Sequence, residues 1–212
     1  MIHTYTQDDL ADHCRILAKQ DQRLRSILDR HGPPPFWHRE PGFACLIRII
    51  LEQQVSLASA YAVYSKLESR LGVITADAML AASDEALKQC GFSRQKMAYA
   101  RILAKAIVSG ELDVDGLARL PDQDVRRELI RIKGIGEWTV NVYLLLSLHR
   151  LDVFPSGDLA LVKAMHRYGY LGPGDKREAV LAQAEAFVPR RSILAILLWH
   201  GYITENNVLM PE

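Results

Sequence analysis

The sequence predicts an all-α protein, and three observations support this fold class. Apolar residues recur at the three- and four-residue spacing of a helix face through most of the 212 residues. Neither a convincing stretch with the two-residue period of a strand nor an internal repeat is present in the sequence. Helix-start and helix-stop residues also follow one another at short intervals along the chain.

The first helices are predicted from Thr6 to about His31, where one or two amphipathic helices present an apolar face. Gly32 and the three prolines after it stop this pattern and favour an extended segment. Phe36 and Trp37 follow the prolines, and aromatic residues at such a place often fix a linker to the core.

A longer helical region begins after Pro41-Gly42 and runs from Phe43 to Leu71. This is long for one globular helix, so we predict a break near Gln53–Ser56. Gln54 falls on the apolar stripe of the region, where an uncharged polar side chain needs a partner. It is either a satisfied buried glutamine at a helix junction or a residue with a function of its own.

Capping residues predict the other helices. Thr75, Ser83 and Ser93 are suited to N-caps, and Gly91 to a helix end. Leu120-Pro121-Asp122 is a further helix start. The helices predicted after residue 150 run from Asp158 to about Tyr168, from Lys176 to Phe187, and from Pro189 through Trp199 to Tyr202.

Residues 129–141 are the centre of the chain, because two apolar helical patterns meet there at Gly134-Ile135-Gly136. Two glycines permit a tight turn with positive φ and a close approach of the backbone to another molecule. The free N–H groups at the start of the next helix suit a phosphate oxygen. A plain helical hairpin is the alternative, and the loop ending at Asp158 downstream favours the binding role.

Composition and charge exclude several classes of protein. A net charge of +1, with 49% hydrophobic and 24% charged residues, gives no global signature of nucleic-acid binding, so any positive field is local. No apolar run is long enough to span a bilayer and no signal peptide is recognised, so we expect a cytoplasmic protein. Cys14, Cys45 and Cys90 are far apart and form no disulfide framework or zinc motif.

Three segments together resemble a known family: Ile50–Ser56, the hairpin with its Trp138-Thr139, and Phe154–Asp158. Their order resembles that of the helix-hairpin-helix-Gly/Pro-Asp DNA glycosylases, and among these the 3-methyladenine DNA glycosylase II branch. The resemblance implies a bilobal helical fold. Residues 43–154 would form a central lobe that contains the hairpin at about 123–148. Residues 1–42 and 155–212 would together form a second lobe. The hairpin would lie at the cleft between the two lobes.

The resemblance makes Asp158 the catalytic residue of a glycosylase that releases alkylated purines, of the 3-methyladenine and 7-methylguanine type, from duplex DNA. Its carboxylate would stabilise the positive charge that develops on the sugar and orient or deprotonate the attacking water. An N-alkylated purine is already cationic and leaves readily, so no general acid is needed. The alternative role for Asp158 is a plain helix N-cap. Trp138 stands where strand-cleaving relatives carry a Schiff-base lysine, so we expect a monofunctional enzyme that leaves an abasic site.

Base flipping requires a pocket for the base and a residue that fills the vacated stack. The resemblance assigns the second role to Gln54, with Gln53 beside it. The pocket candidates are Trp138, which can also simply pack, Trp37 and Phe187. The predicted DNA contacts are Gln54, Gln53, Lys133, Gly134, Ile135, Gly136, Thr139 and Arg191. The resemblance further implies that the backbone carbonyls of Ile130, Ile132 and Ile135 bind a structural Na⁺ or K⁺; no other cofactor is expected.

Two other functions stay open at this point. One is a glycosylase of the same superfamily that acts on deaminated or mismatched bases. The other is a helix-hairpin-helix DNA-binding module without activity, although such modules usually carry hairpins in tandem and this chain has one. We expect a monomer that binds damaged double-stranded DNA in the nucleoid and makes no contact with a membrane.

Overall fold

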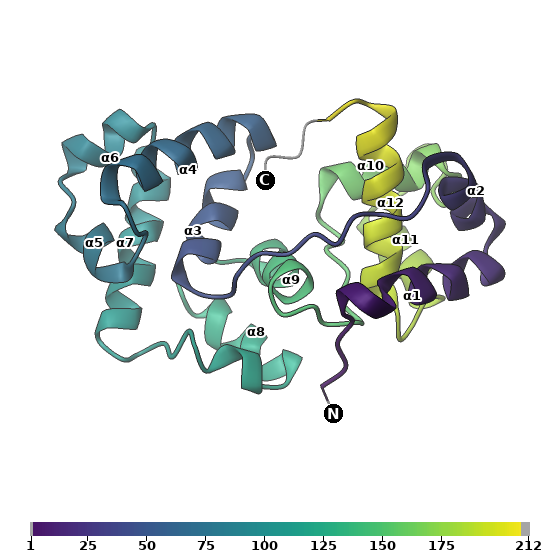
Figure 1. Cartoon of the computed structure of the whole chain (residues 1–212), viewed down its shortest axis with the longest axis horizontal. Coiled ribbons are helices and arrows are strands. Elements are labelled where there is room, and N and C mark those ends of the chain that lie inside the picture. The colour runs from purple at the N-terminus through teal and green to yellow at the C-terminus, as the bar shows by residue number, and fades with distance from the viewer. Residues whose placement is uncertain (1, 209–212) are drawn as a thin grey trace. The chain divides into compact units, whose positions relative to one another are not determined.

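The computed structural model describes residues 2–208, and every named secondary-structure element within that range is a helix, which confirms the predicted all-α class (Figure 1). The only β-type pairing among these residues is an isolated bridge between Thr4 and Arg150. The α-helices are α1 (Gln7–Gln20), α2 (Gln22–His31), α3 (Phe43–Glu52), α4 (Leu57–Leu71), α5 (Ala76–Ala81), α6 (Asp84–Cys90), α7 (Arg94–Val108), α8 (Asp122–Ile130), α9 (Glu137–Leu146), α10 (Leu159–Arg167), α11 (Arg177–Glu185) and α12 (Arg191–Glu205), with a 3-10 turn, η1, at Leu117–Arg119.

The described chain forms two compact units. Unit 1 comprises the residues up to His38 together with Leu144–Val208, and unit 2 comprises Arg39–Tyr143. The lobes predicted from the sequence had their boundaries at 42/43 and 154/155, and their terminal residues 1 and 209–212 lie outside the described part of the chain.

Residues 144–154 belong to unit 1 because they pair with the N-terminal segment. The backbone N–H of Tyr5 donates to the carbonyl of His149 (2.9 Å), and that of Leu151 donates to the carbonyl of His3 (2.9 Å). The buried Tyr5 hydroxyl donates to the Leu145 carbonyl at 2.8 Å. These contacts join segments about 140 residues apart in the sequence, which the helical periodicity could not predict.

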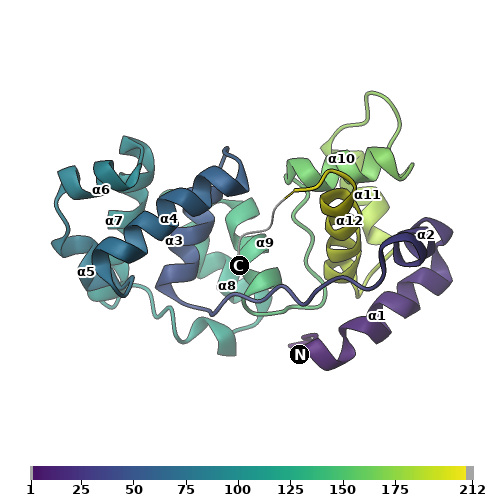
Figure 2. The ribbon, with the colours of Figure 1, turned by 45° about the horizontal axis from the view of Figure 1, so that its top comes forward.

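Unit 1 is built around α12, which packs against α1, α2, α10 and α11 (Figure 2). The residues of α12 from Ser192 to Leu198 are all buried, so the helix is apolar on every side, as expected for a central helix. The C-terminal end of α12 is the exception, because it carries the carboxylate of Glu205.

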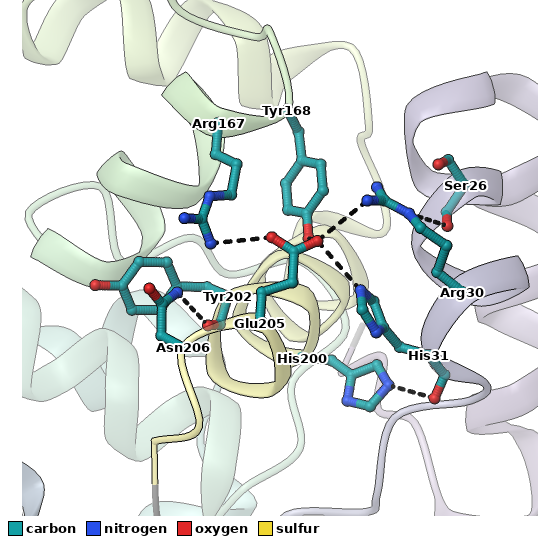
Figure 3. A network of polar contacts seen from close by, with 9 residues as sticks. All are labelled: Ser26, Arg30, His31, Arg167, Tyr168, His200, Tyr202, Glu205 and Asn206. Atoms are coloured by element: carbon teal, nitrogen blue, oxygen red, sulfur yellow. Dashed lines mark hydrogen bonds and ion pairs between the residues drawn. The ribbon is translucent and has the colours of Figure 1, made fainter.

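Glu205 joins three helices of unit 1 through one carboxylate (Figure 3). Arg30 (3.3 Å) and His31 (3.2 Å) reach it from the end of α2, and Arg167 and the Tyr168 hydroxyl, each at 2.9 Å, from the end of α10. Burial alone would raise the pKa of Glu205, but the hydrogen bonds and the two arginine charges lower it below its ordinary value of 4.5.

We expect this carboxylate to make unit 1 sensitive to acid. As the pH falls, the Glu205 carboxylate of the unfolded chain takes up its proton around its ordinary pKa of 4.5. In the folded chain the pKa is lower, so the carboxylate stays ionised to lower pH. Its contribution to the free energy of unfolding is therefore present above that pH and is lost as the pH falls through the folded pKa. Urea unfolding from about pH 6 to about pH 3 should show a shallower loss of stability for Glu205→Gln than for wild type. The exposed Glu178 provides the control, and equal pH slopes for wild type and Glu205→Gln would rule the expectation out.

Unit 2 is held together by α7, which packs against α3, α5 and α6, and by α4, which packs against α3 and α6. The predicted caps are confirmed: the side chains of Thr75, Ser83 and Ser93 each accept a backbone N–H of the helix that follows. The predicted break is confirmed as well, because α3 ends at Glu52 and α4 begins at Leu57.

The end of α3 carries a buried ion pair. The guanidinium of Arg39 donates to both carboxylate oxygens of Glu52, at 2.7 and 2.8 Å, and the side chains of the two residues are 10% and 7% exposed. Arg48 lies 3.7 Å from the same carboxylate. The single negative charge of Glu52 therefore lies close to two arginines at the point where the loop 53–56 begins.

Two further predictions concern cysteines and membranes. Cys14, Cys45 and Cys90 are buried, and none of the three takes part in a disulfide bond. Over residues 2–208 no group of three or more His, Cys, Asp or Glu side chains is arranged to hold a metal ion. Each helix in this range is too short or too polar to pass through a bilayer.

Candidate functional site

In unit 2, α8 and α9 form the predicted hairpin, and its two glycines have different roles. Gly134 has φ +101°, and a Cβ atom there would lie 2.2 Å from the ring of Tyr99, so only glycine fits. Gly136 has no positive φ, and a Cβ atom on it would meet nothing within 4 Å. The predicted φ-positive turn is therefore formed with the positive φ at Gly134, and the exposed backbone of Gly136 stands directly before α9.

Buried residues and one arginine hold the hairpin closed. Ile132 and Ile135 are 2% and 5% exposed, and the Ile135 N–H donates to the Ile132 carbonyl at 3.0 Å. Arg126 on α8 binds Glu137 and the Asn141 side-chain oxygen (2.7 Å) on α9. The Ile132 carbonyl is one of the three predicted ligands of the cation. A carbonyl oxygen has two lone pairs, so it can accept this hydrogen bond and still bind an ion. The cation site therefore stays a prediction.

The predicted DNA contacts of the hairpin differ in exposure. Lys133 and Gly136 are exposed, whereas Thr139 is buried, with an exposed fraction of 1%. The Thr139 hydroxyl accepts a hydrogen bond from Gln53 at 3.0 Å. The structure therefore gives the Thr139 side chain an internal partner, and a contact of Thr139 with DNA stays a prediction.

The two glutamines of the loop 53–56 also have different environments. Gln53 is half-buried, and its amide nitrogen donates to the Gly134 carbonyl (2.9 Å) as well as to Thr139. Gln54 is exposed and has φ +58°, a left-handed conformation that is uncommon outside glycine. The satisfied glutamine at the helix junction is thus Gln53, and the buried alternative considered for Gln54 is wrong.

In unit 1, Asp158 is the N-cap of α10. A helix N-cap is the alternative to a catalytic role that the sequence left open for this residue. Its Oδ1 accepts the backbone N–H of Leu161 at 2.9 Å and the indole N–H of Trp199 at 3.1 Å. The ring of Trp37 meets Trp199 edge-on, with centroids 6.4 Å apart. Unit 1 therefore brings a half-buried carboxylate and two half-buried tryptophans together.

Trp199 was absent from the site residues predicted by sequence, and it is the partner that orients the Asp158 carboxylate. A weak signal for it existed, since a tryptophan on an otherwise apolar helix needs an acceptor for its N–H group. The acceptor lies 41 residues away, so the sequence could not identify it. Phe36 fixes the linker through ring contacts with Tyr5 and His149, as expected for an aromatic residue after the prolines.

The loop that leads to Asp158 is held by the first two residues of α12. Arg191 binds the carboxylate of Asp152 with two nitrogens, at 2.8 and 2.9 Å. A third nitrogen of Arg191 donates to the carboxylate of Glu185 at 3.2 Å. The Ser192 hydroxyl donates to the Arg150 carbonyl at 2.6 Å. Arg191 was predicted to contact DNA, but two carboxylates already neutralise its charge, and its contacts are those of a residue that positions the loop.

Two pocket candidates remain. Trp138 lies half-buried in the first turn of α9 in unit 2. Phe187 is 7% exposed and packs edge-on against Tyr170 in unit 1, with centroids 6.0 Å apart, which is the environment of a core residue.

A family model described as HhH-GPD superfamily base excision DNA repair protein matches residues 47–190, a range that includes the loop 53–56, the hairpin and Asp158. The chain belongs to the HhH-GPD superfamily. The predicted resemblance to helix-hairpin-helix glycosylases is confirmed by this match.

Three relatives illustrate the similarity of this HhH-GPD protein to others. DNA-3-methyladenine glycosylase 1 of Schizosaccharomyces pombe is 29% identical over 191 residues, which cover 88% of this chain and 84% of the relative. A putative DNA-3-methyladenine glycosylase of Bacillus subtilis is 28% identical; the match covers 84% of this chain and 65% of that protein's length. The crystal structure of a DNA-3-methyladenine glycosidase from Bacillus halodurans is 30% identical, with a TM-score of 0.76, and covers 98% of this chain and 95% of its own.

Proposed function

We propose that this HhH-GPD protein is a monofunctional DNA glycosylase that hydrolyses the N-glycosidic bond of alkylated purines in duplex DNA. The observation that carries the proposal is the Asp158 carboxylate, held at the start of α10 by the Leu161 N–H and the Trp199 indole. The names of the relatives from S. pombe and B. halodurans support the class of substrate.

The chemistry follows from the charge that develops during base release. As the bond between C1′ and the base breaks, the sugar acquires oxocarbenium character, and a carboxylate close to it lowers the barrier electrostatically. Water then adds to C1′ and loses its proton, for which Asp158 is the proposed acceptor. The alkylated purine leaves as a neutral base because the alkyl group already made it cationic, so the scheme requires no acid group.

The hairpin and the loop 53–56 supply the DNA-binding part of the proposal. The exposed backbone at Gly136, at the start of α9, suits a phosphate oxygen, and the exposed Lys133 adds a positive charge. Gln54 is the proposed wedge, since it is exposed in the loop 53–56 and has a left-handed backbone conformation. Trp37 and Trp199 offer aromatic surface to a cationic base in unit 1.

The proposal is tested with duplex DNA that contains 7-methylguanine or 3-methyladenine at one position. We expect free base to be released and the strand to remain intact until alkali is added, because Trp138 cannot form a Schiff base with the sugar. Borohydride trapping should give no covalent complex. Strand cleavage without alkali would contradict the monofunctional assignment, and release of deaminated or mismatched bases instead of alkylpurines would change the substrate class.

A further inference from the structure

The side chain of Gln53 joins the loop 53–56 to the turn of the hairpin. One amide nitrogen donates to the Gly134 carbonyl (2.9 Å) and to the Thr139 hydroxyl (3.0 Å), residues more than 80 positions further along the chain. Gly134 belongs to the turn itself and Thr139 to the first turn of α9. The backbone N–H of Gln53 contacts the Ile50 carbonyl (3.4 Å) at the end of α3. The residue therefore contacts α3 with its backbone and the hairpin with its side chain.

Helix α7 reinforces this junction from the other side. The Lys96 ammonium donates to the Leu51 carbonyl at 2.6 Å and so caps the C-terminal end of α3. Tyr99, one turn further along α7, lies against Gly134 so closely that no side chain fits there. One face of α7 thus holds both the end of α3 and the turn that Gln53 binds.

We propose that Gln53 is a positioning residue that couples the hairpin to Gln54. The inference rests on the proposed function, in which the hairpin holds a phosphate and Gln54 enters the duplex. Gln54 has a left-handed backbone that is costly for a non-glycine residue and persists only where its neighbours fix it. Gln53 is the neighbour that connects Gln54 with the hairpin. Binding of a phosphate by the hairpin and entry of Gln54 into the duplex are therefore coupled.

Gln53→Met tests the proposal, because methionine keeps the length of the side chain and removes both hydrogen bonds. The DNA carries a tetrahydrofuran abasic analogue with 2-aminopurine opposite it, whose fluorescence reports entry of a residue into the stack. We expect affinity to fall roughly tenfold, as for the loss of two neutral hydrogen bonds. We also expect most of the fluorescence change to be absent even at saturating protein. A structural defect alone would lower the affinity and leave the saturated signal unchanged.

The matched control is Gln89→Met, since Gln89 also lies in unit 2 but binds Arg70 between α6 and α4. Thr139→Val removes one of the two partners and should give an intermediate loss of signal. Circular dichroism melts establish that each variant is folded. A saturated signal for Gln53→Met equal to that of wild type would overturn the proposal.

A double-mutant cycle measures the coupling directly. In the wild-type background, Lys133→Ala and Gln54→Ala should have non-additive effects on the affinity for the abasic duplex, and in Gln53→Met they should add. Equal coupling in both backgrounds would overturn the inference and leave the proposed function intact. If wild type binds the abasic duplex without any fluorescence change, both the wedge role of Gln54 and the inference fail. Absence of base release alone would count only against the proposed function.

Discussion

Asp158→Asn is expected to reduce single-turnover base release from 7-methylguanine DNA by about 10²- to 10⁴-fold while DNA affinity stays close to wild type. Asparagine has almost the same shape as aspartate and is an equally good N-cap. Its side-chain oxygen can still accept the Leu161 N–H and the Trp199 indole, so α10 should begin as before. The substitution removes only the negative charge and the proton acceptor.

The control for this variant is Asp21→Asn in the same unit. Asp21 is the N-cap of α2, accepts the backbone N–H of Arg23, and binds the Arg23 side chain. It has the same residue type and local role as Asp158, but none of the proposed chemistry. Base release by Asp21→Asn should match wild type. If the Asp158→Asn protein binds DNA and releases base at the wild-type rate, Asp158 is only a helix N-cap and the proposed catalytic role is wrong. That result would favour a DNA-binding module as the function of the protein.

Glu52→Ala is expected to lower the free energy of unfolding of unit 2 by about 3–5 kcal/mol. The substitution leaves Arg39 buried without the carboxylate that binds it through two hydrogen bonds, and Arg48 loses a nearby opposite charge. Both side chains of the main pair are at most 10% exposed, so solvent screens the interaction little. Arg39 in the variant must either stay buried with a poor partner or move and open the end of α3.

Amide hydrogen exchange measures this effect unit by unit, because α3 and α7 report on unit 2 while α10 and α12 report on unit 1. We expect faster exchange in α3 and α7 and little change in unit 1. The matched control is Glu85→Ala, which removes an exposed pair with Lys88 on α6 and should change stability by less than about 1 kcal/mol. Similar protection of α3 in Glu52→Ala and Glu85→Ala would show that the buried pair contributes little.

The sequence alone predicted the helices and several of their ends, because those features depend on residues within one or two turns. Ser83 and Ser93 accept backbone N–H groups three residues later, and Asp158 does the same. The break between α3 and α4 followed from helix length. The same local logic identified the Gly134-Ile135-Gly136 turn, and the family resemblance then connected it with Asp158.

Only the tertiary structure decided what the individual site residues contact. Gln53 and Thr139 are 86 positions apart, and Trp199 and Asp158 are 41 apart, so no local pattern could pair them. The partner of Arg191, Asp152, lies 39 positions away, so the sequence could not show that this side chain has an internal contact. Helical spacing put Gln54 on a buried stripe because it assumed that the helix continues. The chain instead leaves helical geometry after Glu52, and the next two side chains then point to different surroundings, Gln53 to the hairpin and Gln54 to solvent.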